Sequence, residues 1–155
     1  MSPEAPTRAA ARAGSVLQKV VSAEMASASS TAALLRSGAS WRRERMRAAD
    51  MISLTEAARF ALVKRVTIRS WIKTGRAIGV EHTSGTFKLP RWQFEPPIWA
   101  GIQAVTKALG TTDGWQLLIF IESPSPALGG LSPRAALEQG TDMRRILAFA
   151  SAEAH

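Results

Sequence analysis

"LTEAARFALVKRVTIRSWIKTG", residues 54–75, contains two short helical patterns that adjoin one another. Ser53 precedes the first pattern, and Glu56 lies in its first turn. Their Ser-x-x-Glu spacing is that of a capping box, in which each side chain accepts a hydrogen bond from the other residue's backbone N–H. We expect the chain to turn near residues 62–64 and a second helix to run from about residue 65 to residue 73. Gly75 is the kind of residue that ends a helix in the left-handed conformation.

The two sides of the second helix differ in chemistry. An α-helix has about 3.6 residues per turn, so Ile68, Trp71 and Ile72 share one apolar face that should pack inward. The opposite side and its flanks carry basic and hydroxyl groups, and these are the candidate DNA-contacting residues: Arg65, Thr67, Arg69, Ser70 and Lys73. A solvated basic face is the simpler interpretation of one isolated helix, so the choice depends on the surrounding sequence.

The positive charge of the chain is concentrated around this stretch. The formal net charge is +8, and residues 42–91 alone carry twelve basic and four acidic side chains. Residues 1–41 add a net charge of +2, and residues 92–155 have a net charge of −2. Such asymmetry favours a polyanion partner for the middle third of the chain and another role for the remainder.

A β-hairpin is predicted after the second helix. Residues 77–82 and 87–90 flank "TSGT" at residues 83–86, a turn that contains glycine. Two short helices followed by a hairpin are typical of a winged helix-turn-helix, in which the second helix enters the major groove of DNA. Lys88 and Arg91 would then contact the phosphate backbone, which supplies most non-specific affinity. Trp92 and Phe94 are expected to hold the hairpin onto the body of the protein.

The fold class predicted for the whole chain is mainly α, with a short β-hairpin wing. Proline and glycine between apolar helical patterns predict a series of helices after residue 96, with a turn at residues 123–131. Gly38 is expected to end an N-terminal helix, and a further helix is expected at residues 41–50. The predicted organisation is a disordered segment (1–14), a helical region suited to oligomerisation (15–50), a DNA-binding domain (51–95) and a small helical domain (96–155).

Three segments of the basic region carry a family resemblance: "LTEAA" (residues 54–58), "VTIRSWIKTG" (residues 66–75) and "LPRWQF" (residues 89–94). Together they resemble the helix-turn-helix of MerR-like and excisionase-like DNA-binding proteins. The chain departs from that pattern at Lys64, where such proteins usually place a serine cap. It also lacks the usual glycine of the turn, at Ala61 and Leu62.

A second resemblance lies in the C-terminal part. It is carried by Trp115, Pro126, Leu128-Gly129-Gly130, Ser132-Pro133, Leu137 and Gly140. Residues 96–152 thereby resemble the toxin-binding domain of Xre/MbcA/ParS-type antitoxins. The resemblance implies a protein toxin as partner, commonly a RES-type toxin that consumes NAD, with the DNA-binding half repressing the shared operon. The implied toxin contacts are Leu128, Gly129, Gly130 and Leu131, although the leucines could equally close the domain's own core.

Catalysis is not predicted. The chain has no cysteine, and its two histidines, His82 and His155, lack the spacing of a zinc site. The three aspartates lie where helix ends are expected, so capping explains them. We therefore expect a non-enzymatic protein without metal or cofactor. No apolar run is long enough to span a bilayer, and a cytoplasmic location is the default.

The predicted function is an antitoxin of a type II toxin–antitoxin system that binds its own operator. Because one recognition helix reads only a half-site, a homo-oligomer on a palindromic operator is expected. The main alternative is a stand-alone regulator or excisionase-like factor whose C-terminal part binds another protein. An interaction scaffold without DNA binding also remains open. Attachment to a membrane surface through "WRRERMR" (residues 41–47) is less favoured, because that segment has little apolar face.

Overall fold

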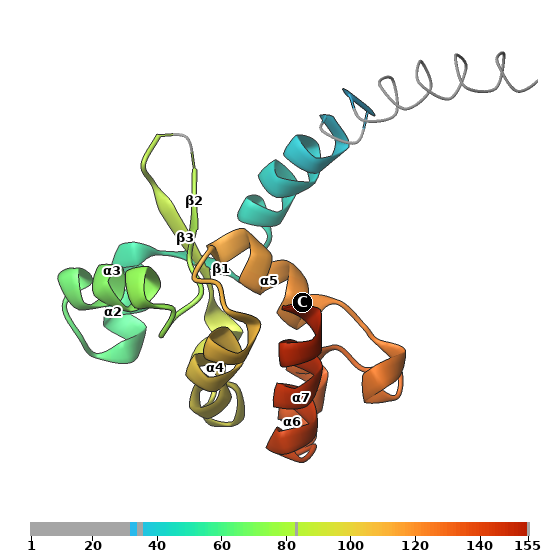
Figure 1. Ribbon diagram of the computed structural model, residues 1–155. Helices are drawn as coiled ribbons and strands as arrows, with labels where there is room; N and C mark the ends of the chain where they lie inside the picture. Colours follow the sequence, from blue (N-terminus) through green and yellow to red (C-terminus); the bar gives the residue numbers. More distant parts are fainter. Residues whose placement is uncertain (1–31, 34–35, 83, 155) are drawn as a thin grey trace, which may run out of the picture. The chain divides into compact units, whose positions relative to one another are not determined.

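The computed structural model describes residues 32–33, 36–82 and 84–154 (Figure 1). The chain divides into two compact units, Met1–Arg45 and Met46–His155. The segment predicted to be disordered, residues 1–14, lies outside the described residues, as does most of the N-terminal helix that Gly38 was expected to end.

Helical backbone is described at residues 32–33 and 36–47, where one helix was expected to end at Gly38 and another to occupy residues 41–50. The prediction that Gly38 ends a helix is wrong, because Gly38 lies within the helical stretch 36–47. Its φ is outside the left-handed region, and a side chain at this position would meet open space. Glycine in a helix interior costs only about 1 kcal/mol relative to alanine, which is too little to end a helix alone.

Residues 46–155 are mainly helical, with a small three-stranded antiparallel sheet. The first part of this unit contains β1 (Met51–Ser53), α2 (Leu54–Ala61), α3 (Arg65–Thr74), β2 (Val80–Glu81), β3 (Phe87–Pro90) and the 3-10 helix η1 (Arg91–Phe94). The strand order is β1-β3-β2, with Ile52 opposite Leu89 and Val80 opposite Lys88. The sequence did not predict β1, because three residues are too few to show the alternation of a strand.

Local signals place the ends of α2 and α3 as predicted. The Ser53 hydroxyl accepts a hydrogen bond from the Glu56 N–H at 3.1 Å, and the Glu56 carboxylate accepts one from the Ser53 N–H at 3.0 Å. Leu62 ends α2 in the left-handed conformation, with φ of 59°. Lys64 is the N-cap of α3 and provides no side-chain hydrogen bond. Leu62 thus turns the chain in a strained conformation, and α3 begins without a side-chain cap.

Four helices and a 3-10 turn complete the unit. They are α4 (Pro96–Leu109), α5 (Gly114–Glu122), η2 (Pro126–Leu128), α6 (Pro133–Glu138) and α7 (Met143–Glu153). Asp113 and Asp142 are the N-caps of α5 and α7, as predicted, and Ser132 is the N-cap of α6. Asp50 has a different role, because its carboxylate accepts a hydrogen bond from the Trp92 indole at 2.9 Å. The N-cap of α2 is Ser53.

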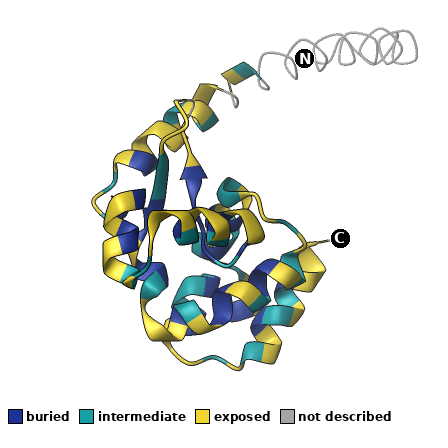
Figure 2. Cartoon of the chain, turned by 90° about the vertical axis from the view of Figure 1, so that its left-hand side faces the viewer, coloured by how far each residue is buried: buried dark blue, intermediate teal, exposed yellow. Residues whose placement is uncertain are grey.

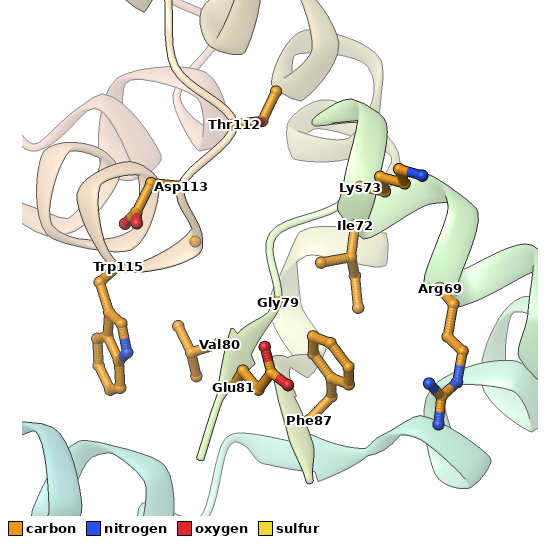
Figure 3. Close-up of a pocket in the computed structure, with 11 residues that line it drawn as sticks. Arg69, Ile72, Lys73, Gly79, Val80, Glu81, Phe87, Thr112, Asp113 and Trp115 are labelled. Carbon is orange, nitrogen blue, oxygen red and sulfur yellow. The ribbon is translucent and has the colours of Figure 1, made fainter. Parts of the chain in front are cut away.

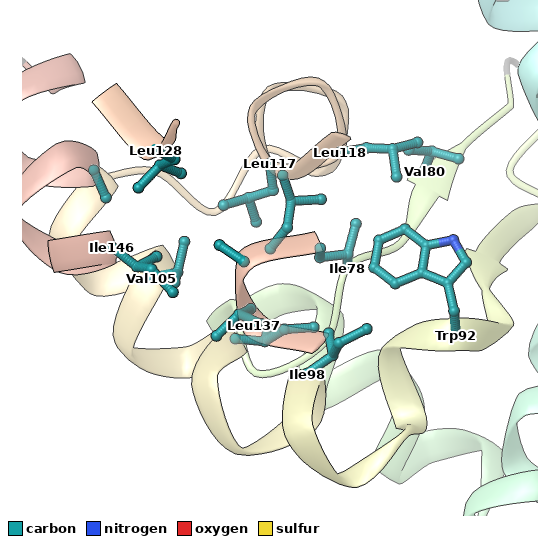
Figure 4. Close-up of a cluster of buried hydrophobic side chains, with 14 of the residues drawn as sticks. Ile78, Val80, Trp92, Ile98, Val105, Leu117, Leu118, Leu128, Leu137 and Ile146 are labelled. Atoms are coloured by element: carbon teal, nitrogen blue, oxygen red, sulfur yellow. The ribbon is translucent and has the colours of Figure 1, made fainter. Parts of the chain in front are cut away.

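Two apolar clusters stabilise this unit. The first, here called the α2–α3 core, consists of Ile52, Leu54, Ala57, Ala58, Ile68, Ile72, Ala77 and Leu89. The second, the C-terminal core, joins Met46, Met51, Ile78, Val80 and Trp92 to the buried residues of α4, α5, η2, α6 and α7 (Figure 4). Figure 2 shows how buried and exposed residues alternate along the helices. The predicted boundary at residues 95/96 falls inside this compact unit.

The buried Gln93 ties the chain before β2 to the end of β3. Its side-chain oxygen accepts a hydrogen bond from the Ile78 N–H at 2.7 Å, and its amide nitrogen donates to the carbonyl oxygens of Ile78 and Pro90. Gln93 has no exposed surface. Because a buried polar group is costly unless it is hydrogen-bonded, this side chain fixes the connection from α3 into the hairpin.

Candidate nucleic-acid interface

The inner face of α3 packs as the apolar spacing predicts. Ile68 is fully buried and Ile72 nearly so, both in the α2–α3 core. Trp71 is half-buried, with its ring centroid 5.1 Å from that of Trp99. The tryptophan therefore packs against another aromatic ring and the core. A stacking platform for nucleic-acid bases would need its ring face open to solvent.

The outer side of α3 is open to solvent. Arg65, Arg69, Ser70 and Lys73 are exposed, and Thr67 is half-buried. Within the part of the chain that the structure describes, none of the three cations forms a salt bridge with a carboxylate. Their charge is consequently not neutralised by the described residues, which is the condition for attraction to an external polyanion.

Arg69 leans toward the hairpin. Its guanidinium carbon lies 5.7 Å from the centroid of the Phe87 ring, a cation–π distance. Arg69 and Lys73 line one side of a cleft of about 520 Å³, and Asp113 and Trp115 line the other (Figure 3). Glu81 also lines the cleft, so carboxylates and cations both contribute to its charge. The cleft itself is therefore a weaker anion site than the open side of α3.

Lys88 and Arg91, the predicted backbone contacts, are not at the tip of the hairpin. Lys88 lies half-buried on the central strand, where it pairs with Ser53 and Val80. Arg91 follows the other end of β3, and its N–H donates to the Asp50 carbonyl at 2.8 Å. Residues 82–86, between the two strands, include neither lysine nor arginine. If these two cations contact phosphates, Lys88 would do so from the central strand. Arg91 would do so from the end of β3 that lies away from the hairpin turn.

The pKa of Glu56 is lowered from its ordinary value of 4.5. The main cause is the hydrogen bond from the Ser53 backbone, followed by that from its hydroxyl, with smaller contributions from the charges of Lys88 and Arg59. The carboxylate that completes the capping box thus stays ionised at neutral pH. Its negative charge lies close to two of the cations of this region.

Sequence reasoning missed two cations. Arg59 is exposed on the last turn of α2 and lines a hollow of about 410 Å³ together with Glu56, Phe60 and Arg91. Lys64 is exposed at the start of α3. A first helix that crosses the DNA backbone would use such residues. The signal was present, because Arg59 lies on the side of α2 opposite Ala57 and Ala58, but the predicted contacts came only from the second helix and the hairpin region.

Sequence reasoning also missed Val66. It is 67% exposed and belongs to neither apolar cluster. On a helix with about 3.6 residues per turn, Val66 lies close in angle to Ser70 and Lys73 on the outer side. The contacts predicted from the sequence on that side were all basic or hydroxyl side chains, which left Val66 out.

The turn predicted to bind a toxin is closed by backbone hydrogen bonds. The Ser125 carbonyl accepts from the N–H groups of Leu128 and Gly130, and the Ser125 N–H donates to the Leu131 carbonyl. Gly129 and Gly130 are exposed, with positive φ. Leu128 is only 3% exposed and belongs to the C-terminal core, and the half-buried Leu131 packs against that core. Leu128 therefore packs in the domain's own core and is not exposed for contact with a partner.

Among the described residues, no cluster of three or more His, Asp or Glu side chains is arranged to hold a metal ion. His82 lies in the hairpin, where its Nδ1 is 3.1 Å from the Ser84 hydroxyl. No helix in the described part of the chain combines the length and apolar character needed to cross a membrane.

No family model, curated protein sequence or solved structure matches the chain. A function must therefore be inferred from the chain's own residues and their geometry.

Proposed function

We propose that the protein binds double-stranded DNA by placing α3 in the major groove, as a winged helix-turn-helix. The observation that carries the proposal is the division of α3 into two sides. Ile68 and Ile72 are buried in the α2–α3 core, whereas Arg69 and Lys73 are exposed and unpaired by any described carboxylate. A helix of this kind can approach phosphates and base edges without losing its packing.

The surrounding elements support the same orientation. In a helix-turn-helix the N-terminal part of the second helix contacts base edges while the first helix crosses the backbone. Arg65 and Val66 open α3, and Arg59 lies on α2 near Arg91. The second helix therefore offers groups for base contacts at its start, and the first helix offers cations for the phosphates.

A single α3 would read one half-site, so the proposal includes a homo-oligomer on a palindromic operator. The helical region predicted at residues 15–50 is the candidate oligomerisation element. The role is one of binding and not of catalysis, and it implies a cytoplasmic location. Sedimentation of the protein with a duplex of one half-site and with a full palindrome should give different stoichiometries.

The test begins with a duplex selected by the full-length protein from a random-sequence pool. Affinity for this duplex should fall linearly with salt on a logarithmic scale, because each neutralised phosphate releases about 0.9 of a counterion. Combining Arg69→Ala with Lys73→Ala should reduce affinity at least tenfold and lower the salt slope by about 2.

The matched control combines Lys107→Ala with Arg144→Ala. Both cations are exposed on the C-terminal helices α4 and α7, so this variant loses the same charge from a different surface. It should bind the selected duplex nearly as well as the original protein. Equal losses in the two variants would indicate a general charge effect. Unchanged affinity in a folded Arg69/Lys73 variant would refute the proposed interface.

We also propose that the turn at residues 125–131 contributes to binding and neutralising a protein toxin, with RES-type toxins favoured by the resemblance. The observation that supports this role is the closed geometry of the turn, in which Gly129 and Gly130 are exposed above the buried Leu128. A rigid loop loses little conformational entropy on binding, which favours affinity. Arg145 adds rigidity, since its guanidinium donates to the Ala127 carbonyl at 3.0 Å.

The experiment uses the full chain, because the C-terminal core includes residues from both sides of residue 95. The protein encoded by the adjacent gene is expressed in cells, alone and together with this chain, and the growth of the cells is measured. Ala127→Glu, on the exposed face of the turn, should abolish rescue, whereas Ala100→Glu, exposed on α4, should retain it. If the protein encoded by the adjacent gene does not slow growth when expressed alone, the antitoxin role is refuted and the stand-alone regulator is favoured.

A further inference from the structure

Val66 is the most exposed apolar side chain of α3, with 67% of its surface accessible. It is the second residue of the helix and lies on the side opposite the buried Ile68. Successive residues are about 100° apart around a helix axis, which places Val66 about 20° from Lys73 and about 40° from Ser70. An aliphatic side chain therefore lies near the centre of the polar side of this helix.

Packing within the chain does not account for this position. Val66 is absent from the α2–α3 core and from the partly buried residues around it, which include Val63 and Trp71. Scattered exposed apolar residues are common on protein surfaces, but this one lies where the proposed interface meets base edges. Its neighbours Ser70 and Lys73 can donate hydrogen bonds, and Val66 cannot.

The chemistry of the major groove indicates what such a residue would contact. Thymine carries a C5-methyl group in the major groove, and the other three standard bases present only polar groups or ring C–H there. Apolar side chains contact that methyl group, whereas Arg, Asn and Gln read hydrogen-bonding edges. The two methyl groups of valine are held stiffly at χ1, so little entropy is lost when they pack.

We propose that Val66 reads the C5-methyl group of one thymine in each operator half-site. The inference rests on the proposed function, since it requires α3 to enter the major groove. In this arrangement Arg69 and Lys73 contact the phosphates that flank the thymine, and Ser70 faces the next base step. The residue then contributes to sequence preference without adding to the salt dependence of binding.

The experiment replaces thymines of the selected duplex, one position at a time, with deoxyuridine, which lacks only the methyl group. At one position in each half-site, this change should weaken binding of the original protein about fourfold. That is the loss expected when the interface no longer buries one methyl group, here the C5-methyl of the replaced thymine. Val66→Ser, which puts a small polar side chain in place of the two methyl groups, should bind the thymine and uracil duplexes equally at that position. The side chain is exposed, so the variant should unfold at the same temperature as the original protein.

Leu62→Ala provides the matched control, because Leu62 is an exposed apolar residue outside the outer side of α3. That variant should keep the full sensitivity to uracil. If the original protein binds every uracil-substituted duplex as tightly as the thymine duplex, or if Val66→Ser remains sensitive to the substitution, the role of Val66 is refuted while DNA binding stands. A protein with no salt-sensitive affinity for any selected duplex would instead refute the proposed function itself.

Discussion

Gly114, the first residue of α5, lies directly against the backbone of Gly79, so that a Cβ on residue 114 would overlap the Gly79 carbonyl oxygen. A Cβ on residue 79 would in turn crowd the Ile72 side chain. This close approach lets the start of α5 pack on the chain that enters β2. It thereby joins the α3–hairpin region to the C-terminal helices.

Gly114→Ala should therefore destabilise the protein. Overpacking typically costs 1–3 kcal/mol, and here the added methyl group meets backbone, which cannot rotate away, so a loss on the order of 2 kcal/mol is expected. Urea unfolding followed by circular dichroism measures it. Gly38→Ala is the control, because Gly38 is helical and a side chain there meets open space. If both variants are equally stable, the contact between Gly114 and Gly79 is not tight.

Gln93→Leu should also lower stability, for a different reason. The substitution keeps a side chain of similar size but removes the partners of the buried Ile78 N–H and carbonyl groups. Each buried polar group left without a partner costs about 1–3 kcal/mol, so a loss of at least about 2 kcal/mol is expected. Gln116→Leu, exposed on α5, should change the unfolding free energy little. An unchanged unfolding free energy in Gln93→Leu would show that water takes over the hydrogen bonds of the Gln93 amide.

The capping box should make stability depend on acid pH. The folded-state pKa of Glu56 is below its ordinary value of 4.5. Its contribution is therefore fully present above the unfolded-state pKa and is lost as pH falls through the folded-state pKa. The difference in unfolding free energy between the original protein and Glu56→Gln should be largest near pH 7 and should shrink below about pH 4.5. A difference that does not vary with pH would mean that the carboxylate charge is unimportant.

Leu62→Gly should stabilise the protein. Leu62 is a left-handed, non-glycine residue with 90% of its surface exposed, so glycine loses little packing there. The left-handed conformation costs an L-residue roughly 1–2 kcal/mol, which is partly offset by the greater freedom of glycine in the unfolded chain. A net gain of up to about 1 kcal/mol is expected in thermal or urea unfolding. Ala61→Gly, one residue earlier in α2, should be destabilising.

Much of the α2–α3 pair could be predicted because its signals are local. The Ser53–Glu56 spacing defines a helix start, and the positions of Ile68 and Ile72 define the inner side of α3. Gly75 ends that helix with φ of 78°, as expected. The N-caps Asp113 and Asp142 follow the same logic, since a cap acts within one turn of its own helix.

The placement of the more distant contributors could not be predicted. Lys88 lies on the second strand of the hairpin, as expected, but the pairing of β3 with the unpredicted β1 makes that strand the central one of the sheet. Arg91 follows the end of β3, where its N–H donates to the Asp50 carbonyl. From the sequence, Leu128 could contact a partner or lie in the core. The packing of η2 buries it in the core. The exposure of Val66 likewise depends on how α3 packs in the folded chain, because an apolar residue in a helix is ordinarily expected to face the core.

The sequence by itself determined that residues 54–75 form two helices and that α3 has one apolar and one basic side, because hydrogen bonds and helical periodicity act between residues a few positions apart. Only the tertiary structure decided that Gly114 packs on Gly79, that Gln93 bridges Ile78 and Pro90, and that strands and C-terminal helices share one core. Those contacts join residues that are distant in the chain, and their energy depends on shape and burial that no local pattern encodes.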